Sequence, residues 1–355
     1  MAMVKLGDVA IEKRETWTGS TQGVPIIGLE HLVPGEITLS SWDSDTDNTF
    51  SKMFRKDQVL LGRRRVYLKK AVIAPFDGIC SGDITVIEAI PGKISPRLLP
   101  FIIQNERFFD YAIQGSAGSL SPRVKWEHLK DYEFNLSDYE EQESLANKLW
   151  SALKLKESYH ALLLATDEMV KSRFIEMFGN LESKKRLGDV ASYINGFAFK
   201  PSDWSTTGLP IIRIQNLTGS NEVFNYYDGD YPAQVEVNNG DILISWSATL
   251  GVYVWLEGKA LLNQHIFKVS FDKGYINRGY FIYAVTQKLD EMSTKTHGTT
   301  MRHIVKSDFD NTIIPFPSID QQDQFALIAC QADKSKFELK QAIEKIDKVM
   351  RALLQ

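Results

Sequence analysis

The sequence predicts an α+β protein built from two similar halves, each a strand-rich domain followed by a long helix. Short sequences recur about 180 residues apart, and in each half short apolar runs give way to a long amphipathic pattern. The length of 355 residues also exceeds that of most single domains. These observations indicate two strand-rich domains, whose helices we expect to pair as an antiparallel coiled coil.

Three recurring motifs carry the evidence for an internal duplication. KLGDVA at 5–10 returns as RLGDVA at 186–191, GVPII at 23–27 returns as GLPII at 208–212, and EEQE at 140–143 returns as DQQD at 320–323. Because solenoid repeats run roughly 20 to 50 residues, this much longer period indicates a duplicated domain.

Strands are expected in both halves, over 1–137 and over 180–317. Short apolar runs bounded by Gly, Pro and Asp are typical of strands and turns. Such runs lie at 24–27, 59–61, 84–87, 210–214 and 241–244. We therefore expect one strand-rich domain in each of the two ranges.

A long helix is expected after each strand-rich domain, over 138–179 and 318–355. Ser137-x-x-Glu140 and Ser318-x-x-Gln321 are typical of capping boxes, in which side chains bond the free amides of a first turn. The first pattern closes at a glycine and an asparagine, residues that commonly end a helix. About 40 residues at about 1.5 Å each would make a rod near 60 Å.

The apolar spacing of these helices predicts that they pair with each other. In the second helix, steps of four and three residues join Leu339, Ile343, Ile346, Met350 and Leu353, which is the seam of a coiled coil. The matching positions of the first helix form a weaker seam of Tyr159, Leu163, Thr166, Val170 and Arg173. Each helix alone would more commonly pack on its own domain, but two similar long helices in one chain favour pairing.

Composition excludes several protein classes. No apolar run approaches the roughly 20 residues that span a bilayer, and the start of the chain has no signal-peptide core. Cys80 and Cys330 are the two cysteines, too few for a disulfide framework or a cysteine zinc site, and the six histidines show no metal-ligand spacing. We expect a cytoplasmic protein with no metal site and no membrane partner.

Charge is unevenly distributed along the chain. The net charge of -4 argues against a protein that coats nucleic acid indiscriminately. Between Lys52 and Lys70, however, eight basic residues accompany a single acid, Asp57, and the second half has no such cluster. The first half therefore carries a local basic surface.

The sequence contains few motifs that are typical of catalytic sites. The sequence lacks an adenine-methyltransferase signature, a phosphate loop and a nucleophile elbow. Asp241, Glu257 and Lys259 have the residue types of a metal-dependent nuclease, with carboxylates for Mg²⁺ and a lysine near the attacked phosphate. The same residues also fit a strand start and a turn, so the nuclease stays an alternative.

The order of the motifs resembles that of type I restriction-modification specificity subunits, the DNA-recognition components of those complexes. The resemblance covers essentially the whole chain. It rests on LGDVA opening each half, NGFAFK at 195–200, GLPIIRI at 208–214, GDILIS at 240–245, IPFP at 314–317 and DQQ at 320–322.

The resemblance implies two target-recognition domains, 1–137 and 180–317, that each read one half of a split, asymmetric DNA sequence. It implies that the helices set the spacer and dock two modification (methyltransferase) subunits. The chain would then be non-catalytic, since S-adenosylmethionine, ATP and Mg²⁺ act in the modification and restriction subunits. A two-domain scaffold for protein partners is the third interpretation.

Two loops in each half are candidates for reading DNA. Arginine forks fit guanine edges, lysines neutralise phosphates, and Gly, Ser and Thr allow close backbone approach. In the first half the candidates are Arg63, Arg64, Arg65, Lys69, Lys70, Ser116, Ser119 and Arg123. In the second half they are Trp246, Ser247, Thr249, Thr299, Thr300, Arg302 and His303, an assignment that rests mostly on the resemblance. The alternatives are a solvated basic turn, flexible loops and a core position for Trp246.

Overall fold

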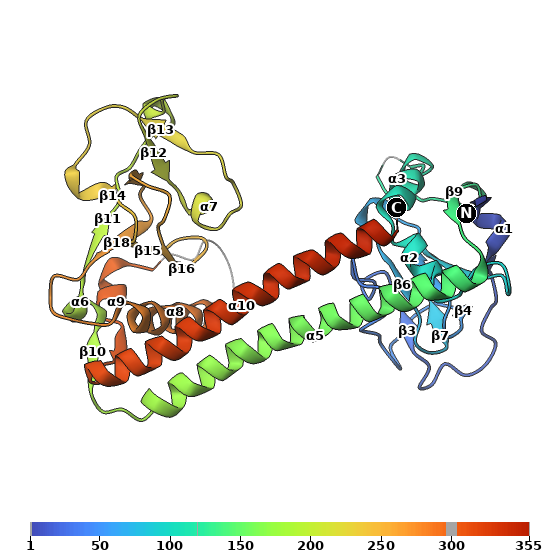
Figure 1. Ribbon diagram of the computed structural model, residues 1–355, viewed down its shortest axis with the longest axis horizontal. Helices are drawn as coiled ribbons and strands as arrows, with labels where there is room; N and C mark the ends of the chain where they lie inside the picture. Colours follow the sequence, from blue (N-terminus) through green and yellow to red (C-terminus); the bar gives the residue numbers. More distant parts are fainter. Residues whose placement is uncertain (1, 119, 296–303, 355) are drawn as a thin grey trace. The chain divides into compact units, whose positions relative to one another are not determined.

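The structure, a computed structural model, describes residues 2–118, 120–295 and 304–354. Contacts divide the chain into two compact units (Figure 1): unit 1 comprises residues 1–160 and 340–355, and unit 2 comprises residues 161–339. The boundaries fall inside both long helices, so each unit contains part of each helix. The helices are therefore shared between the units and do not form segments of their own.

Unit 1 contains three sheets. β1 (Ala2–Lys5) pairs antiparallel with β9 (Glu133–Leu136), next to the long helix that follows β9. A four-stranded antiparallel sheet has the order β2-β8-β5-β6, and a three-stranded sheet has the order β3-β7-β4. The strands of these two sheets are β2 (Ala10–Lys13), β3 (Ile26–Ile27), β4 (Lys52–Phe54), β5 (Val59–Gly62), β6 (Ala71–Ile73), β7 (Gly78–Cys80) and β8 (Ile84–Ala89).

Two apolar clusters lie on opposite sides of β5. Val59 and Leu61 join a cluster with Phe101 and Phe108 of the short helices, whereas Leu60 joins the cluster around Phe54. This alternation follows from the period of two in a strand. The short helices of unit 1 are α1 (Leu6–Val9), η1 (Val66–Leu68), α2 (Leu99–Ile103), α3 (Glu106–Gln114) and α4 (Trp126–Leu129).

Unit 2 has a similar plan, with a second four-stranded sheet where unit 1 has a three-stranded one. Its two four-stranded sheets have the orders β11-β18-β15-β16 and β13-β12-β17-β14, and β10 pairs antiparallel with β19. The strands are β10 (Lys184–Arg186), β11 (Ser192–Asn195), β12 (Leu209–Ile212), β13 (Asn225–Tyr227), β14 (Glu236–Val237), β15 (Ile242–Ser245), β16 (Gly251–Val254), β17 (Ala260–Leu262), β18 (Ile266–Ser270) and β19 (Ile313–Pro315).

Strand β15 of unit 2 alternates as β5 does. Ile242 and Ile244 join one apolar cluster, and Leu243 joins the other. The expected strands at 59–61, 84–87 and 241–244 are thus present, whereas the run at 210–214 ends as a strand at Ile212. The other helices of unit 2 are α6 (Leu187–Val190), η2 (Pro201–Asp203), α7 (Ile214–Leu217), η3 (Ala233–Val235), α8 (Arg278–Lys295) and α9 (Lys306–Asp310).

The two long helices are α5 (Tyr139–Phe178) and α10 (Ile319–Leu353), green and red in Figure 1. At α10 the predicted capping box is present, with Ser318 N donating to Gln321 Oε1 and Gln321 N donating to Ser318 Oγ. At α5 the predicted box of Ser137 and Glu140 is wrong. There the Asp138 carboxylate accepts from the amide of the residue three positions on, at 2.9 Å, which satisfies a first-turn donor equally well.

Within each unit the two long helices contact each other. Lys156 of α5 pairs with Asp347 of α10 in unit 1 at 2.6 Å, and Asp167 of α5 pairs with Lys336 of α10 in unit 2 at 2.8 Å. The predicted seam is buried at Val170 and Ile343. It is half-buried at Tyr159, Leu163, Leu339, Ile346, Met350 and Leu353.

A buried glutamine joins each long helix to the domain beside it. In unit 1, Gln142 accepts from the Ser95 amide at 2.8 Å and donates to the Ser137 carbonyl at 2.9 Å. In unit 2, Gln322 accepts from the amide of Asn277 at 2.9 Å and donates to the carbonyl of Pro317 at 2.9 Å. These glutamines belong to the recurring EEQE and DQQD motifs, and their equal bonding explains why a glutamine stands in both.

None of the helices in the described part of the chain combines the length and the apolar character that crossing a membrane requires.

Candidate nucleic-acid interface

The two candidate loops of unit 1 lie against each other. The first loop leaves β5 at Gly62 and is closed by a hydrogen bond from the Gly62 amide to the Lys70 carbonyl at 2.9 Å. Two further backbone hydrogen bonds join it to the second loop, from Val124 N to Arg63 O at 3.0 Å and from Arg65 N to Pro122 O at 2.7 Å. Segments about 60 residues apart in the sequence therefore form one surface.

A carboxylate holds one arginine from each of these loops. Arg123 donates from Nε to Asp83 Oδ1 at 2.7 Å and from Nη2 to Oδ2 at 3.3 Å. Arg64 donates from Nη1 to Asp83 Oδ2 at 3.4 Å and from Nε to Ser121 Oγ at 2.6 Å. The side chains of Arg64 and Arg123 are 42% and 46% exposed and that of Asp83 is 20% exposed, so the acid lies beneath the two guanidinium groups.

The charge state of this group follows from its hydrogen bonds. The bonds from Arg123 hold the pKa of Asp83 below its ordinary value, against the opposing effect of its partial burial, and Arg64 contributes further. Asp83 is therefore ionised throughout the neutral range. It partly neutralises two arginines that would otherwise repel each other.

The other basic residues of the first loop differ in their availability. Lys69 pairs with Glu106, and Lys70 donates to the Leu29 carbonyl at 2.7 Å, so both are partly committed within unit 1. Arg63 is half-buried and its Nε is fully buried. Arg63 is thus less exposed than Arg64, and its role in DNA reading stays a prediction. Arg65 is exposed.

Backbone strain marks the same loop. Arg65 and Lys69, on either side of η1, both have φ of 53°, a left-handed conformation that costs a residue other than glycine on the order of 1 kcal/mol. The intervening turn leaves Tyr67 and Leu68 exposed. In the second loop, Ser116 is half-buried and its hydroxyl donates to the Ile113 carbonyl, whereas Ser119 lies outside the described residues.

Unit 2 has the same backbone arrangement with other side chains. Trp246 N donates to His265 O at 3.2 Å, and Ile304 N donates to Trp246 O at 3.0 Å. In unit 1, Arg63 makes the corresponding bonds, accepting from Val124 and donating to the Asp83 carbonyl at 2.9 Å. His265 therefore occupies the position in unit 2 that Asp83 occupies in unit 1. Two positions after Trp246, Ala248 has a φ of 58°, matching the left-handed residue two positions after Arg63.

Two of the site predictions for unit 2 are corrected by this arrangement. The Trp246 ring packs on His265 and stacks on Phe267, with centroids 4.9 and 5.6 Å apart, which supports the alternative core position. Ser247 is only 6% exposed, so its hydroxyl is not presented at the surface. Thr249 is exposed, and its carbonyl accepts from the Ser245 hydroxyl. Thr299, Thr300, Arg302 and His303 lie outside the described residues.

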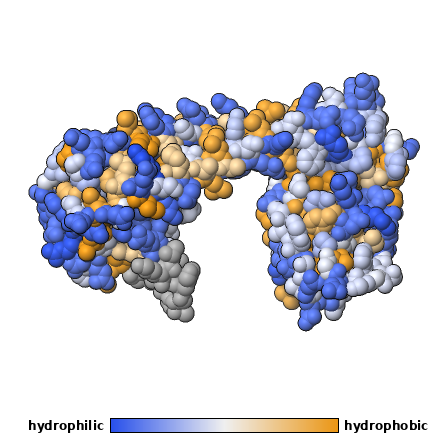
Figure 2. Space-filling view, turned by 90° about the horizontal axis from the view of Figure 1, so that it is seen from below, coloured by the Kyte–Doolittle hydropathy of each residue, from blue (hydrophilic) through white to orange (hydrophobic). Residues whose placement is uncertain are grey.

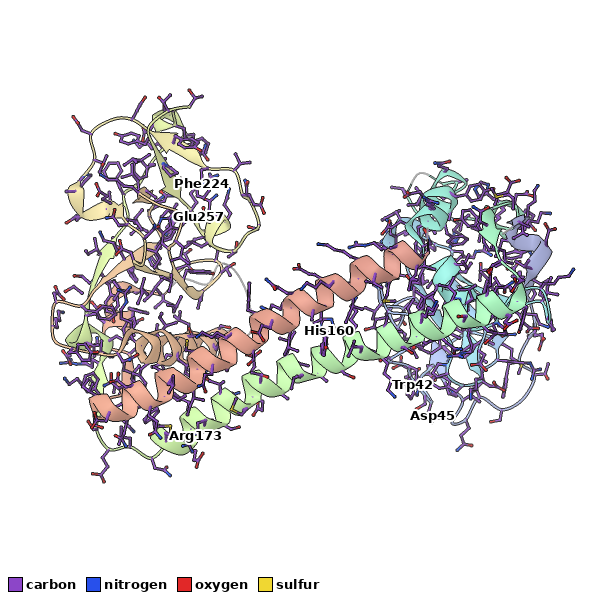
Figure 3. The ribbon with its side chains drawn as sticks, viewed as in Figure 1. Trp42, Asp45, His160, Arg173, Phe224 and Glu257 are labelled. Carbon is purple, nitrogen blue, oxygen red and sulfur yellow. The ribbon has the colours of Figure 1, made fainter. Side chains whose placement is uncertain are left out.

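The residues of the nuclease alternative do not assemble. Lys259 pairs with Glu236 at 2.8 Å, and Asp241 accepts from a backbone amide in the turn before β15. Glu257, labelled in Figure 3, lies exposed on the loop between β16 and β17. Within the described residues, no group of three or more His, Cys, Asp and Glu side chains could hold a metal ion. The structure therefore does not support the metal-dependent nuclease.

Comparison with known proteins agrees with the sequence resemblance. The family described as type I restriction modification DNA specificity domain matches residues 181–348. The type I restriction enzyme EcoBI specificity subunit of Escherichia coli is 26% identical over 174 residues, which cover 47% of this chain and 36% of that protein. The match therefore spans only about a third of that relative's length.

Two solved structures share the fold along nearly the whole chain. One is the S subunit of a type I restriction-modification system from M. genitalium, with a TM-score of 0.61 and 12% identity over 99% of this chain and 94% of that one. The other comes from a study of complex assembly and conformational transition of the type I R-M system, with a TM-score of 0.61 and 18% identity over 99% and 96%. Through residues 181–348, this chain is similar to the family described as type I restriction modification DNA specificity domain.

Proposed function

We propose that this chain is the DNA-recognition subunit of a type I restriction-modification complex and that each unit reads one half of a bipartite target. The observation that carries the proposal is the meeting of the two candidate loops of unit 1, which presents Arg64 and Arg123 on one surface. Guanidinium groups of this kind bond guanine bidentately in the major groove and also bond phosphate oxygens.

The two halves of the target should differ in sequence. Both units have the same hydrogen-bonded backbone arrangement at their candidate loops, but Arg63, Arg64 and Arg65 of unit 1 correspond to Trp246, Ser247 and Ala248 of unit 2. A loop with arginines and a loop without them present different donors to base edges. The proposed target is therefore asymmetric and not a palindrome.

The long helices are proposed to fix the spacing of the two half-sites as an antiparallel coiled coil. Contacts between α5 and α10 within each unit support this, as does the burial of Val170 and Ile343 in the predicted seam. Half-sites read from one face of B-DNA lie about 34–36 Å apart, and a helix of about 40 residues is about 60 Å long. The duplicated motifs and the buried glutamines support descent of the two units from one ancestral domain.

The same helices are proposed to dock two modification (methyltransferase) subunits. Apolar side chains, orange in Figure 2, gather at the surface of the helical segments. A helix with many exposed apolar residues outside its own core is typical of a surface that binds a partner. Exposed members are Leu155, Leu162, Leu164, Met169 and Ile175 of α5 and Leu327, Phe337 and Val349 of α10.

Catalysis is proposed to lie in the partner subunits. S-adenosylmethionine would act in the modification subunits, and ATP and Mg²⁺ in the restriction subunits, with the assembled complex working in the cytoplasm.

Selection from a random DNA duplex pool tests the proposal. The full chain, assembled with its modification subunit, should enrich two short sequences separated by a spacer of fixed length. Affinity should also fall steeply with salt, because phosphate contacts release counterions. Capture of protein partners with no enriched sequence and no salt-sensitive DNA binding would favour the scaffold interpretation.

A further inference from the structure

We propose that Asp83 is a specificity-determining residue of unit 1, which positions the guanidinium groups of Arg64 and Arg123 for base reading. The inference rests on the proposed function and goes beyond it, because it assigns a role in DNA reading to an acid. A carboxylate near DNA is repelled by the phosphates, so its presence beneath two arginines requires a separate reason.

The geometry supplies that reason. Arg123 bonds both oxygens of Asp83 through Nε and Nη2, the side edge of its guanidinium. A guanidinium carries five N–H donors in a fixed fork, so the end edge formed by Nη1 and Nη2 stays available. When one edge of a guanidinium group is held, the other edge keeps a fixed orientation. Bidentate bonding to guanine O6 and N7 requires such an orientation.

Arg64 is held from two directions. Its Nε donates to the Ser121 hydroxyl at 2.6 Å, and its Nη1 donates to Asp83. Free arginine side chains occupy many rotamers, and ordering one on binding costs roughly 0.5–1.5 kcal/mol. Two arginines ordered before DNA arrives avoid part of that cost, and their fixed orientation favours the base sequence that it fits.

The backbone of Asp83 is part of the same structure. Its carbonyl accepts from the Arg63 amide at 2.9 Å, and its own amide donates to the Ser81 hydroxyl at 3.2 Å. Asp83 directly precedes β8 and is thus hydrogen-bonded to the start of the first loop, which follows the neighbouring strand β5. Because it also holds Arg123 of the second loop, one residue sets the position of both loops relative to each other.

The second unit shows that the fold does not require this acid. His265 takes the place of Asp83 in the backbone arrangement, and its ring packs on Trp246. The arginine-positioning role is therefore particular to unit 1. Its loss should affect one half-site only, and the half-site read by unit 2 serves as an internal control.

The test compares target selection by the wild-type complex with selection by Asp83→Asn. Asparagine keeps the shape but replaces one acceptor oxygen with an amide group that cannot accept from arginine. We expect discrimination at one or two base positions of one half-site to fall about 10-fold, while the other half-site is unchanged. Affinity for random duplex should stay the same or rise, because a negative charge near the phosphates is removed.

Two further variants separate positioning from simple charge or stability effects. Asp110→Asn removes an exposed acid of α3 and should leave the selected sequence unchanged. In the Arg64→Ala, Arg123→Ala double variant, the Asp83→Asn change should have no further effect on base discrimination, because Asp83 acts by positioning those two arginines.

Three results would overturn the inference. An unchanged motif with Asp83→Asn, while the wild type enriches a bipartite one, contradicts positioning but leaves the proposed function intact. Equal loss in both half-sites indicates general destabilisation and also contradicts it. If the wild type itself enriches no sequence, the proposed function fails, and the positioning role fails with it.

Discussion

Arg123 donates from Nε to Asp83 Oδ1 over 2.7 Å, and this pair joins two segments that lie 40 residues apart in the sequence. Together with Arg64 on the same carboxylate, it turns two separate loops into one basic surface. The surface is positively charged, but an acidic residue, Asp83, determines how its arginines are arranged. Specific contacts within unit 1, and not basic charge alone, therefore determine which donors this surface presents.

Arg123→Lys should reduce base discrimination by about 1–3 kcal/mol even though the charge is kept. An ammonium group cannot bond both oxygens of Asp83 and still present a planar fork. Arg107→Lys, a change of the same kind on the exposed surface of α3, is the matched control. Competition binding between selected and altered duplexes measures the effect, and full activity of the lysine variant would show that Arg123 acts only as a charge.

The stability that Asp83 contributes should be insensitive to pH in the neutral range. Its pKa in the folded chain is lowered from the ordinary value of 3.8, mainly by the hydrogen bonds from Arg123. When the pKa of a carboxyl group is lower in the folded chain than in the unfolded chain, its ionised form stabilises the fold. That stability is fully present above the pKa of the unfolded chain, and it is lost as the pH falls through the pKa of the folded chain. The difference in unfolding free energy between wild type and Asp83→Asn should thus hold from about pH 8 to about pH 5 and shrink below about pH 3.8. A change between about pH 6 and 7 would point to a histidine instead.

Gln142→Met and Gln322→Met should each destabilise the unit that contains the residue by about 2–4 kcal/mol. Each change keeps the side-chain volume but leaves a backbone amide and a carbonyl without their partner in a buried position. Gln324→Met, on the exposed surface of α10, should cost less than about 0.5 kcal/mol. Urea denaturation followed by circular dichroism measures these costs, and equal effects at all three positions would show that the bridging bonds contribute nothing.

The two cysteines should differ sharply in reactivity. Cys80 is fully buried, and burial raises the pKa of its thiol to about 12, so almost no thiolate forms at neutral pH. Cys330 is exposed on α10. A colorimetric thiol reagent should therefore label one thiol quickly in the native chain and two in denaturant, and Cys330→Ser should remove the fast reaction. Rapid labelling of that variant would mean that Cys80 is accessible.

Patterns carried by neighbouring residues were predictable from the sequence. The short apolar run of Val59, Leu60 and Leu61 predicts a strand, and the structure places their side chains in two clusters on opposite sides of it. The start of α10 follows similarly from its capping box, whereas at α5 the predicted box is replaced by the Asp138 cap. In both cases the physical cause is local, since the period of a helix or strand determines which residues face the core.

Features that depend on distant partners were not predictable. Asp83 looks like an ordinary turn residue after Ser81 and Gly82, because its partners lie 19 and 40 residues away. Trp246 has a surface-loop neighbourhood in the sequence, but its ring packs against Phe267 of a neighbouring strand. Arg63 likewise resembles the arginines that follow it, and only the fold places its Nε in a buried position.

Selection of target sequences by the wild-type chain and by Arg64→Ala, each assembled with the modification subunit, tests the central claim most directly. The account predicts that the wild type enriches two different short sequences at a fixed spacing. It predicts that Arg64→Ala weakens binding by about 1–3 kcal/mol and relaxes base preference in only one of the two. A uniform loss of affinity with both half-sites intact would make Arg64 a phosphate contact, and failure of the wild type to enrich any bipartite sequence would contradict the account as a whole.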